Sequence, residues 1–109
     1  MKNPDCIFCK IVNKKLPAEI LFENGSLIII KDIKPSAPIH HLIISKEHIK
    51  SVATLEEKNK DLIADMILAA KDDAKLAGLS GYKTVFNVGR EGGQIIDHLH
   101  LHMMGGWKN

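Results

Sequence analysis

The chain has 109 residues, enough for one domain with one hydrophobic core, residues 1–109, and its composition of 45% hydrophobic and 26% charged residues excludes a disordered or fibrous protein. The net charge of +2 comes with scattered rather than clustered lysines, which argues against a nucleic-acid partner. Since we find neither a secretory signal nor an apolar stretch of about 20 residues, we expect a cytoplasmic protein with no membrane partner.

The N-terminal segment predicts a short helix. Apolar residues recur at helical spacing within residues 6–14, namely Ile7, Phe8, Ile11 and Val12. Pro17 cannot continue a helix, so the helix should end before it. Cys6 and Cys9 then lie near its first turn. In a reducing compartment their spacing indicates metal ligation or redox exchange before a structural disulfide.

Three strands are expected next. Asn24-Gly25 is a strong turn dipeptide, and it separates two apolar segments, residues 19–22 and 27–31. These segments predict a hairpin whose strands are at least half-buried. Pro35 and Pro38 mark a loop that leads to a third strand, residues 40–45.

A long helix follows, because the hydrophobic period changes. Thr54 and Glu57 resemble a capping box near its start, and Gly78 is well placed to stop it. From Ile63 onward the apolar positions recur at helical spacing, at Ile67, Ala70, Ala74 and Ala77.

The last third of the chain predicts two strands around a glycine-rich loop. The strands are residues 82–88 and 98–104, the loop is residues 89–93, and Gly105-Gly106 closes the last strand. Strands that are not separated by regularly alternating helices favour an antiparallel sheet. We therefore expect an α+β fold, with a mainly antiparallel five-stranded sheet, one long helix and one short helix, and both helices packed on one face.

The most informative segment runs from His98 to Met104, where histidines alternate with apolar residues. On a strand, alternate side chains share a face, so His98, His100 and His102 should point the same way at intervals of about 7 Å. Three imidazoles on one face are hard to explain by packing. Such a face can bind a metal through neutral ring nitrogens, or it can present one imidazole as a nucleophile or general base.

The loop just upstream, Gly89 to Gln94, suits an anion. Its glycines keep side chains out of the way, so backbone N–H groups can converge on a phosphate beside the central imidazole. Taken alone, a loop with Gly-Gly is more often only a turn. Its place next to the histidines is what gives it weight.

Several motifs in order resemble the histidine triad family, whose signature of histidines alternating with apolar residues fits His98 to Met104 at every position. The likeness extends from Asp5 to Gly106 and points to the branch of nucleotide-binding phosphoramidases. The further segments that carry it are residues 5–11 (DCIFCKI), Asp32-Ile33 with Pro35, Ala37-Pro38 with His40, residues 46–49 (KEHI), residues 87–89 (NVG) and residues 92–94 (GGQ).

This resemblance implies a homodimer whose two sheets join into one, and an enzyme that needs no catalytic cofactor. The expected reaction is cleavage of the bond between the α-phosphate of a purine nucleotide and its leaving group, often an amine, through a covalent nucleotidyl-histidine. His100 would be the nucleophile. His40 and His102 would flank it, hold its tautomer and balance the phosphate charge.

The resemblance also implies a binding site for AMP, GMP or adenosine. Asn87 and the amides around Gly93 and Gln94 would hold the phosphate oxygens, and the Asp32 carboxylate would accept hydrogen bonds from the ribose. The apolar slot for the base would be formed by Ile7, Phe8, Ile11, Leu16, Ile30 and Ile33. Plain core packing is the alternative for each of these six residues.

A structural zinc ion is a further implication, held by Cys6, Cys9, His48 and His98 and tying the short helix to the sheet. The alternative is that the cysteines are metal-free and pack as small hydrophobic residues. If His98 is a zinc ligand, it cannot also contact the substrate.

One position departs from the pattern. Three residues before the first triad histidine, the phosphoramidase branch often has a polar residue that helps the leaving group, and this chain has Ile95 there. Isoleucine neither donates nor accepts a proton. Three alternatives therefore stay open beside the phosphoramidase: a dinucleoside polyphosphate hydrolase, a nucleotide-binding adaptor with incidental hydrolysis, and a metal-dependent enzyme that uses the triad as ligands.

Overall fold

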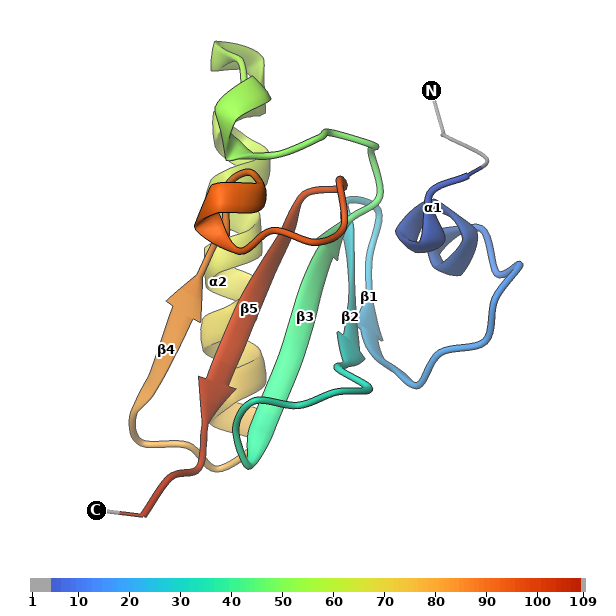
Figure 1. Ribbon diagram of the computed structural model, residues 1–109. Helices are drawn as coiled ribbons and strands as arrows, with labels where there is room; N and C mark the ends of the chain where they lie inside the picture. Colours follow the sequence, from blue (N-terminus) through green and yellow to red (C-terminus); the bar gives the residue numbers. More distant parts are fainter. Residues whose placement is uncertain (1–4, 109) are drawn as a thin grey trace.

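The computed structural model describes residues 5–108. Five strands form one sheet in the order β1-β2-β3-β5-β4, and all neighbouring pairs are antiparallel (Figure 1). The strands are Ile20–Glu23 (β1), Leu27–Lys31 (β2), Ile39–Ser45 (β3), Tyr82–Val85 (β4) and His100–Gly105 (β5). The helices are Ile7–Val12 (α1) and Lys60–Leu76 (α2), with 3₁₀ turns at Val52–Thr54, Glu57–Asn59 and Arg90–Gly92. The predicted α+β class, with a five-stranded antiparallel sheet, one short and one long helix, is confirmed.

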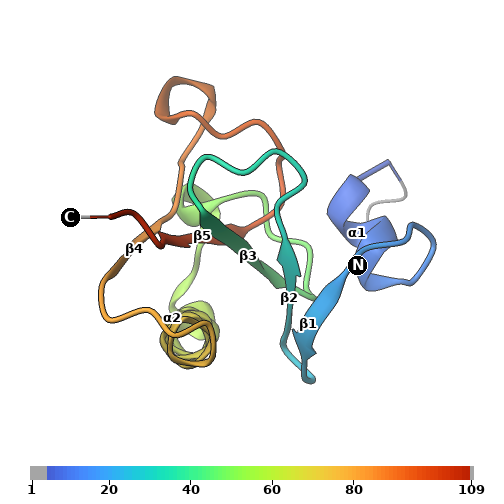
Figure 2. The same cartoon turned by 90° about the horizontal axis from the view of Figure 1, so that it is seen from below.

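Each face of the sheet carries its own hydrophobic core. Side chains alternate along β2, so Leu27 and Ile29 pack toward α2, whereas Ile28 and Ile30 pack toward α1. Figure 2 shows α2 on one side of the sheet and α1 on the other. The expectation that both helices share one face was therefore wrong. A strand that is apolar on both faces needs cover on both sides, and α1 supplies the second cover.

Helix α2 packs mainly over the centre of the sheet. It contacts β3, β4 and β5, and the core on this side contains Leu27, Ile29, Ile43, Ile49, Met66, Ala70, Ala74, Leu99, Leu101 and Met103. Strand β1 lies at the edge and is exposed at all four positions, so the prediction that it is at least half-buried was wrong. The predicted hairpin of β1 and β2 is confirmed, and Asn24 Oδ1 accepts the N–H groups of Ser26 and Leu27 in its turn.

Of the two predicted boundaries of α2, the structure confirms the C-terminal one and contradicts the N-terminal one. Gly78 follows the helix with φ +77°, its N–H donates to the Lys75 carbonyl, and the Leu79 N–H donates to the Ala74 carbonyl, which confirms Gly78 as the helix stop. The prediction of a capping box formed by Thr54 and Glu57 at the start of α2 was wrong. Thr54 instead bonds the backbone of Ser51 in the first 3₁₀ turn, and α2 begins only at Lys60.

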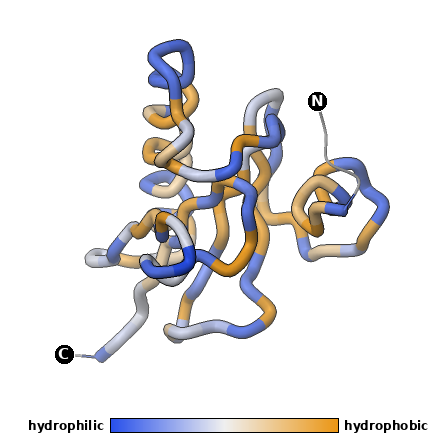
Figure 3. Tube along the Cα trace, turned by 45° about the horizontal axis from the view of Figure 1, so that its top comes forward, coloured by the Kyte–Doolittle hydropathy of each residue, from blue (hydrophilic) through white to orange (hydrophobic). Residues whose placement is uncertain are grey.

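Other boundaries differ by a few residues from the expected ones. Strand β4 ends at Val85, and β5 begins at His100, so His98 lies in the bend before the strand. Ile67 of α2 is 47% exposed, because the buried stripe runs through Met66, Ala70 and Ala74. The loop after α1 is hydrophilic at Asn13-Lys14-Lys15, in contrast to the helix itself (Figure 3). Between residues 5 and 108, no helix combines the length and apolar character needed to cross a bilayer.

Candidate functional site

The register of β3 and β5 gathers three histidines on the α1 side of the sheet. His100 lies opposite Ile44 and His102 opposite Leu42, and residues directly opposite in an antiparallel pair share a face. Ile44 and Leu42 belong to the core beneath α1. His40, two residues before Leu42, therefore faces the same side. The structure thus brings together the three residues expected to be catalytic.

Hydrogen bonds fix the tautomers of His40 and His102. The backbone N–H of Ser36 donates to His40 Nδ1 at 2.9 Å, so the proton of the neutral ring must lie on Nε2. His40 Nε2 is 2.8 Å from His102 Nδ1 and donates to it. The remaining nitrogen of His102, Nε2, must then carry the proton of that ring. We call this directional chain from Ser36 to His102 the imidazole relay.

His100 is held in the opposite tautomer. Its Nδ1 lies 2.6 Å from the carbonyl oxygen of His98, an acceptor only, so Nδ1 carries the proton. Nε2 consequently keeps a free lone pair. Burial lowers the pKa of His100, which favours the neutral ring. The arrangement leaves an imidazole nitrogen that can attack an electrophile without first losing a proton.

Two N–H donors converge beside the His100 imidazole. Asn87 Nδ2 lies 3.4 Å from His102 Nε2, and both atoms carry hydrogens, so neither satisfies the other. His102 and His100 have ring centroids 4.9 Å apart. A common acceptor such as a phosphate oxygen would satisfy both donors. Preorganised donors of this kind stabilise charge that develops during phosphoryl transfer.

We expect the free energy of unfolding to fall in acid, because His102 is held neutral. Burial, followed by charge on His100 and His40, lowers the pKa of His102 from 6.5 to about 4. A pKa that is lower in the folded state leaves this stability intact above pH 6.5 and removes it as the pH falls through about 4. Urea unfolding across this range should show the decline. The variant His102→Asn should make the decline less steep, with the remainder due to the buried His98, and an equal slope in both proteins would contradict the explanation.

The glycine loop is closed by its own hydrogen bonds. The Gly93 N–H donates to the Arg90 carbonyl, and the Gln94 N–H donates to the Gly89 carbonyl. The Gln94 side chain is buried and bonds the N–H of Gly89 and the carbonyls of Lys50 and Ile96. In this conformation the N–H groups of Gly93 and Gln94 themselves are engaged within the protein, and the phosphate-binding role expected of the amides around them stays a prediction. Gln94 anchors the loop.

The Asp32 carboxylate lies beside His40, the first ring of the imidazole relay. One carboxylate oxygen accepts the Lys34 N–H at 2.8 Å, and the other lies 3.4 Å from His40 Nε2. The side chain is half-buried, so lone pairs remain for a ligand. Asp32, His40 and His102 also lie close enough to hold a metal ion. Three of the four ring nitrogens of His40 and His102, however, are already hydrogen-bonded in the relay.

The six residues expected to form the base slot divide into two groups. Phe8, Ile11 and Ile30 are buried in the core beneath α1. Ile7, Leu16 and Ile33 are exposed, and Ile33 is 93% exposed on the loop that carries Asp32. Ile95 is 82% exposed on the glycine loop. The core group packs the sheet, whereas the exposed group is free to contact a ligand.

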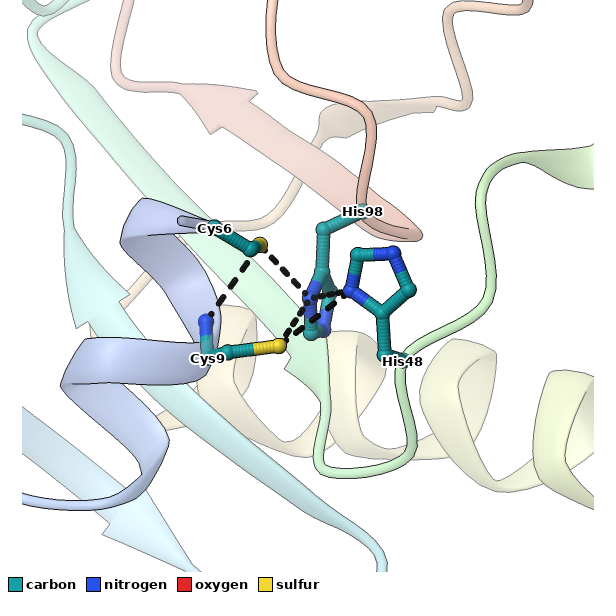
Figure 4. Close-up of side chains that lie close together, drawn as sticks. All are labelled: Cys6, Cys9, His48 and His98. Carbon is teal, nitrogen blue, oxygen red and sulfur yellow. Dashed lines mark hydrogen bonds between the residues drawn. The ribbon is translucent and has the colours of Figure 1, made fainter. Parts of the chain in front are cut away.

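Cys6, Cys9, His48 and His98 converge in one cluster, which we call the metal cluster (Figure 4). Cys6 Sγ lies 3.2 Å from His98 Nδ1, and Cys9 Sγ lies 3.2 Å from His48 Nδ1. The two Nδ1 atoms are 3.1 Å apart. Neighbouring ligands around a tetrahedral zinc ion with ordinary bond lengths lie roughly 3.3 to 3.6 Å apart. The donor set and its spacing therefore fit zinc.

The orientation of His98 supports the same fit. Its Nε2 lies 2.7 Å from the Ser45 carbonyl and donates to it, so Nδ1 presents a lone pair to the cysteines. Histidine ligands of metals usually donate their other ring N–H to such an acceptor. Burial lowers the pKa of His98 to about 4, which keeps the ring neutral. The sulfur atoms are free thiols that form no disulfide.

Sequence reasoning missed several residues that hold the site. Ser36 and Ser45 act through backbone groups, for which a sequence carries no signal. Arg90 bonds both carboxylate oxygens of Asp97 and the Gln94 carbonyl, and so clamps the glycine loop. This pair of opposite charges, at the two ends of the loop, could have been noticed in the sequence.

Comparisons of the sequence with known proteins give a family model that matches residues 5–108 and a relative of similar length. Residues 5–108 match the model of a family described as "Scavenger mRNA decapping enzyme C-term binding". The chain is also 44% identical over 102 residues to Protein HitA of Neisseria gonorrhoeae. This alignment covers 93% of this chain and 95% of HitA.

Solved structures agree in sequence and in shape. A HIT family hydrolase from Legionella pneumophila is 42% identical, with a TM-score of 0.93 and 95% of each chain covered. A zinc-bound histidine triad family protein from Mycobacterium smegmatis is 28% identical, with a TM-score of 0.83 and coverage of 92% of this chain and 73% of that one.

Proposed function

The chain belongs to the histidine triad family, and from this premise we propose that it hydrolyses purine nucleoside 5′-phosphoramidates through a covalent nucleotidyl-His100 and releases AMP or GMP. The observation that carries the proposal is the tautomer of His100. Its Nδ1–H is bonded to the His98 carbonyl, and its free Nε2 lies on the same face as the N–H donors of His102 and Asn87.

In the first step, the lone pair of His100 Nε2 attacks the α-phosphorus. A phosphorus–nitrogen bond to His100 forms, and the bond to the leaving group breaks with its electron pair, which takes up a proton from solvent water so that the free amine departs. His102 Nε2–H and Asn87 Nδ2–H would bond the phosphate oxygens as negative charge builds up on them. The His98 carbonyl would balance the positive charge that the His100 ring acquires.

In the second step, water attacks the phosphorus of the nucleotidyl-histidine, forms a phosphorus–oxygen bond and releases a proton to solvent. The bond to His100 Nε2 breaks, its electron pair returns to the ring, and the nucleoside monophosphate is released. The two steps pass through one nucleophile and one donor pair, so both use the same preorganised geometry. The exposed Ile33 and Ile7 would contact the base, and Asp32 would contact the ribose.

Zinc is proposed as a structural ion in the metal cluster. Two thiolates and two imidazoles would complete its tetrahedral shell, and the metal would supply a rigid joint between α1 and the sheet. The zinc-bound relative from Mycobacterium smegmatis supports this assignment. A cytoplasmic location would suit it, since a reducing compartment keeps Cys6 and Cys9 as thiols.

A homodimer is proposed as the working form. Strand β4 pairs only with β5 among the described residues, and its residues are mostly exposed. An open strand edge of this kind can pair with the same edge of a second copy. The two sheets would then join into one, and the exposed Ile67 of α2 would gain cover.

The test of the function is turnover of adenosine 5′-phosphoramidate, with acid-quenched samples examined by mass spectrometry for a nucleotidyl adduct. We expect AMP to be released and the adduct to map to His100. Diadenosine polyphosphate should be assayed in parallel, because Ile95 offers no proton to an amine. Faster cleavage of the polyphosphate would favour the anhydride hydrolase. Tight AMP binding with no turnover of either compound would favour the adaptor.

A further inference from the structure

The metal cluster and the nucleophile are joined by two direct contacts. His98 presents its Nδ1 to the cluster, and its backbone carbonyl accepts the Nδ1–H of His100 at 2.6 Å. The Phe8 ring lies edge-on to both imidazoles, with centroids 5.8 Å from His98 and 5.0 Å from His100. Any change that moves His98 or Phe8 therefore reaches His100.

The position of Phe8 depends on how firmly the short helix α1 is attached to the rest of the protein. It has six residues, and a helix of that length has little stability of its own in water. Cys6 caps its start, with Sγ 3.4 Å from the Cys9 N–H, and Phe8 lies between the two cysteines. The same two sulfur atoms belong to the metal cluster (Figure 4). A metal ion bound there would fix both ends of the segment that carries Phe8.

We propose that Phe8 is a positioning residue for His100, and that a divalent metal ion in the metal cluster tightens nucleotide binding through it. The inference rests on the proposed nucleotide site. The ion would restrict α1 and the His98 ring together, so that the face presented to the nucleotide is ordered before the nucleotide arrives. By linkage, a nucleotide must then raise the affinity for the metal by the same factor.

The experiment measures both affinities in the full-length protein. AMP binding is titrated calorimetrically to the zinc-loaded protein and to protein stripped by a chelator. Zinc affinity is measured by competition with a chromophoric chelator, with and without saturating AMP. We expect zinc to tighten AMP binding about tenfold, and AMP to tighten zinc binding by the same factor.

Phe8→Leu separates positioning from simple contact. Leucine keeps an apolar side chain in the core but removes the ring edge that touches both imidazoles. The ratio of AMP affinities with and without zinc should fall clearly below tenfold, because only the contact through the His98 carbonyl remains, while zinc affinity without AMP stays unchanged. A direct contact between Phe8 and the base would lower both AMP affinities and leave their ratio alone. Lys10→Ala, on the same helix, should keep the tenfold ratio.

A second readout does not depend on the nucleotide. The ¹⁵N chemical shifts of the His100 ring report its tautomer, and they should indicate a protonated Nδ1 in the zinc-loaded protein and tautomer exchange in the stripped protein. The ring shifts of the zinc-loaded protein can be read whether or not zinc removal loosens the fold.

The remaining outcomes distinguish failure of the proposed function from failure of the coupling between metal and nucleotide. AMP that fails to bind in either state rejects the proposed function. AMP that binds equally well in both states, with His100 unchanged, rejects the coupling and leaves the function standing. A protein that binds no zinc rejects the coupling at its first step.

Discussion

His100→Ala should lose at least about 10⁴-fold in kcat on a nucleoside phosphoramidate, because removal of a nucleophile abolishes the covalent route and leaves only binding and charge stabilisation. AMP should still bind, since His102 and Asn87 keep their donors and the relay from Ser36 does not pass through His100. The measurement is single-turnover kinetics with acid quench, alongside an AMP titration.

The control for this variant is His100→Asn, which keeps a polar side chain of moderate size on the strand. It should also be inactive and should show no nucleotidyl adduct. Thermal unfolding of both variants shows whether the sheet is intact. Substantial turnover by either variant would reject His100 as the nucleophile and point to another group on the same face.

His41→Phe should lower the free energy of unfolding by about 2 to 3 kcal/mol, because it leaves a buried carboxylate without its donor. His41 of β3 and Asp73 of α2 are both 8% exposed, and His41 Nδ1 is hydrogen-bonded to Asp73 Oδ2 between helix and sheet. The pair lies on the α2 side of the sheet, away from the imidazole relay. Urea unfolding near neutral pH is the measurement.

The double variant His41→Phe with Asp73→Leu tests the reason for that loss. If the cost comes from the orphaned carboxylate, removal of both polar groups should recover most of the stability. Phosphoramidate turnover should be retained in the double variant, because neither residue lies on the α1 side. If the double variant is as unstable as His41→Phe, the loss of stability does not come from the unpaired Asp73 carboxylate.

Periodicity in the sequence predicted the parts of the fold that depend on local pattern. Alternation from His98 to Met104 predicted the face that His100 and His102 share, although His98 lies before the strand, and Gly78 predicted the end of α2, since both follow from backbone geometry. The side on which α1 packs could not be read in this way. It depends on which face of β2 lacks cover, and that is a property of the assembled sheet.

Long-range polar contacts in the site were beyond the same reasoning. His41 and Asp73 meet across 32 positions, and His98 finds the Ser45 carbonyl across 53. Backbone donors and acceptors exist at almost every position, so the sequence cannot say which one a ring will use. The spacing of Cys6 and Cys9 indicated metal ligation or redox exchange, but the full set of four ligands was predicted only through the resemblance. The ligands of the metal cluster come from three separate segments, and no single spacing relates them.

The imidazole relay begins at a backbone amide, and this choice affects the kind of substrate that the site accepts. In many hydrolases the histidine is oriented by a carboxylate, which adds a negative charge near the reacting group. Here the Ser36 amide sets the direction of both rings, and the Asp32 carboxylate, although within 4.8 Å of a nitrogen of each ring, accepts no hydrogen bond from His102. The inner end of the relay is therefore an uncharged hydrogen-bond donor. A phosphate oxygen, as proposed for this site, would accept that N–H, so the direction of one peptide bond would determine that the relay ends in a donor and not in an acceptor.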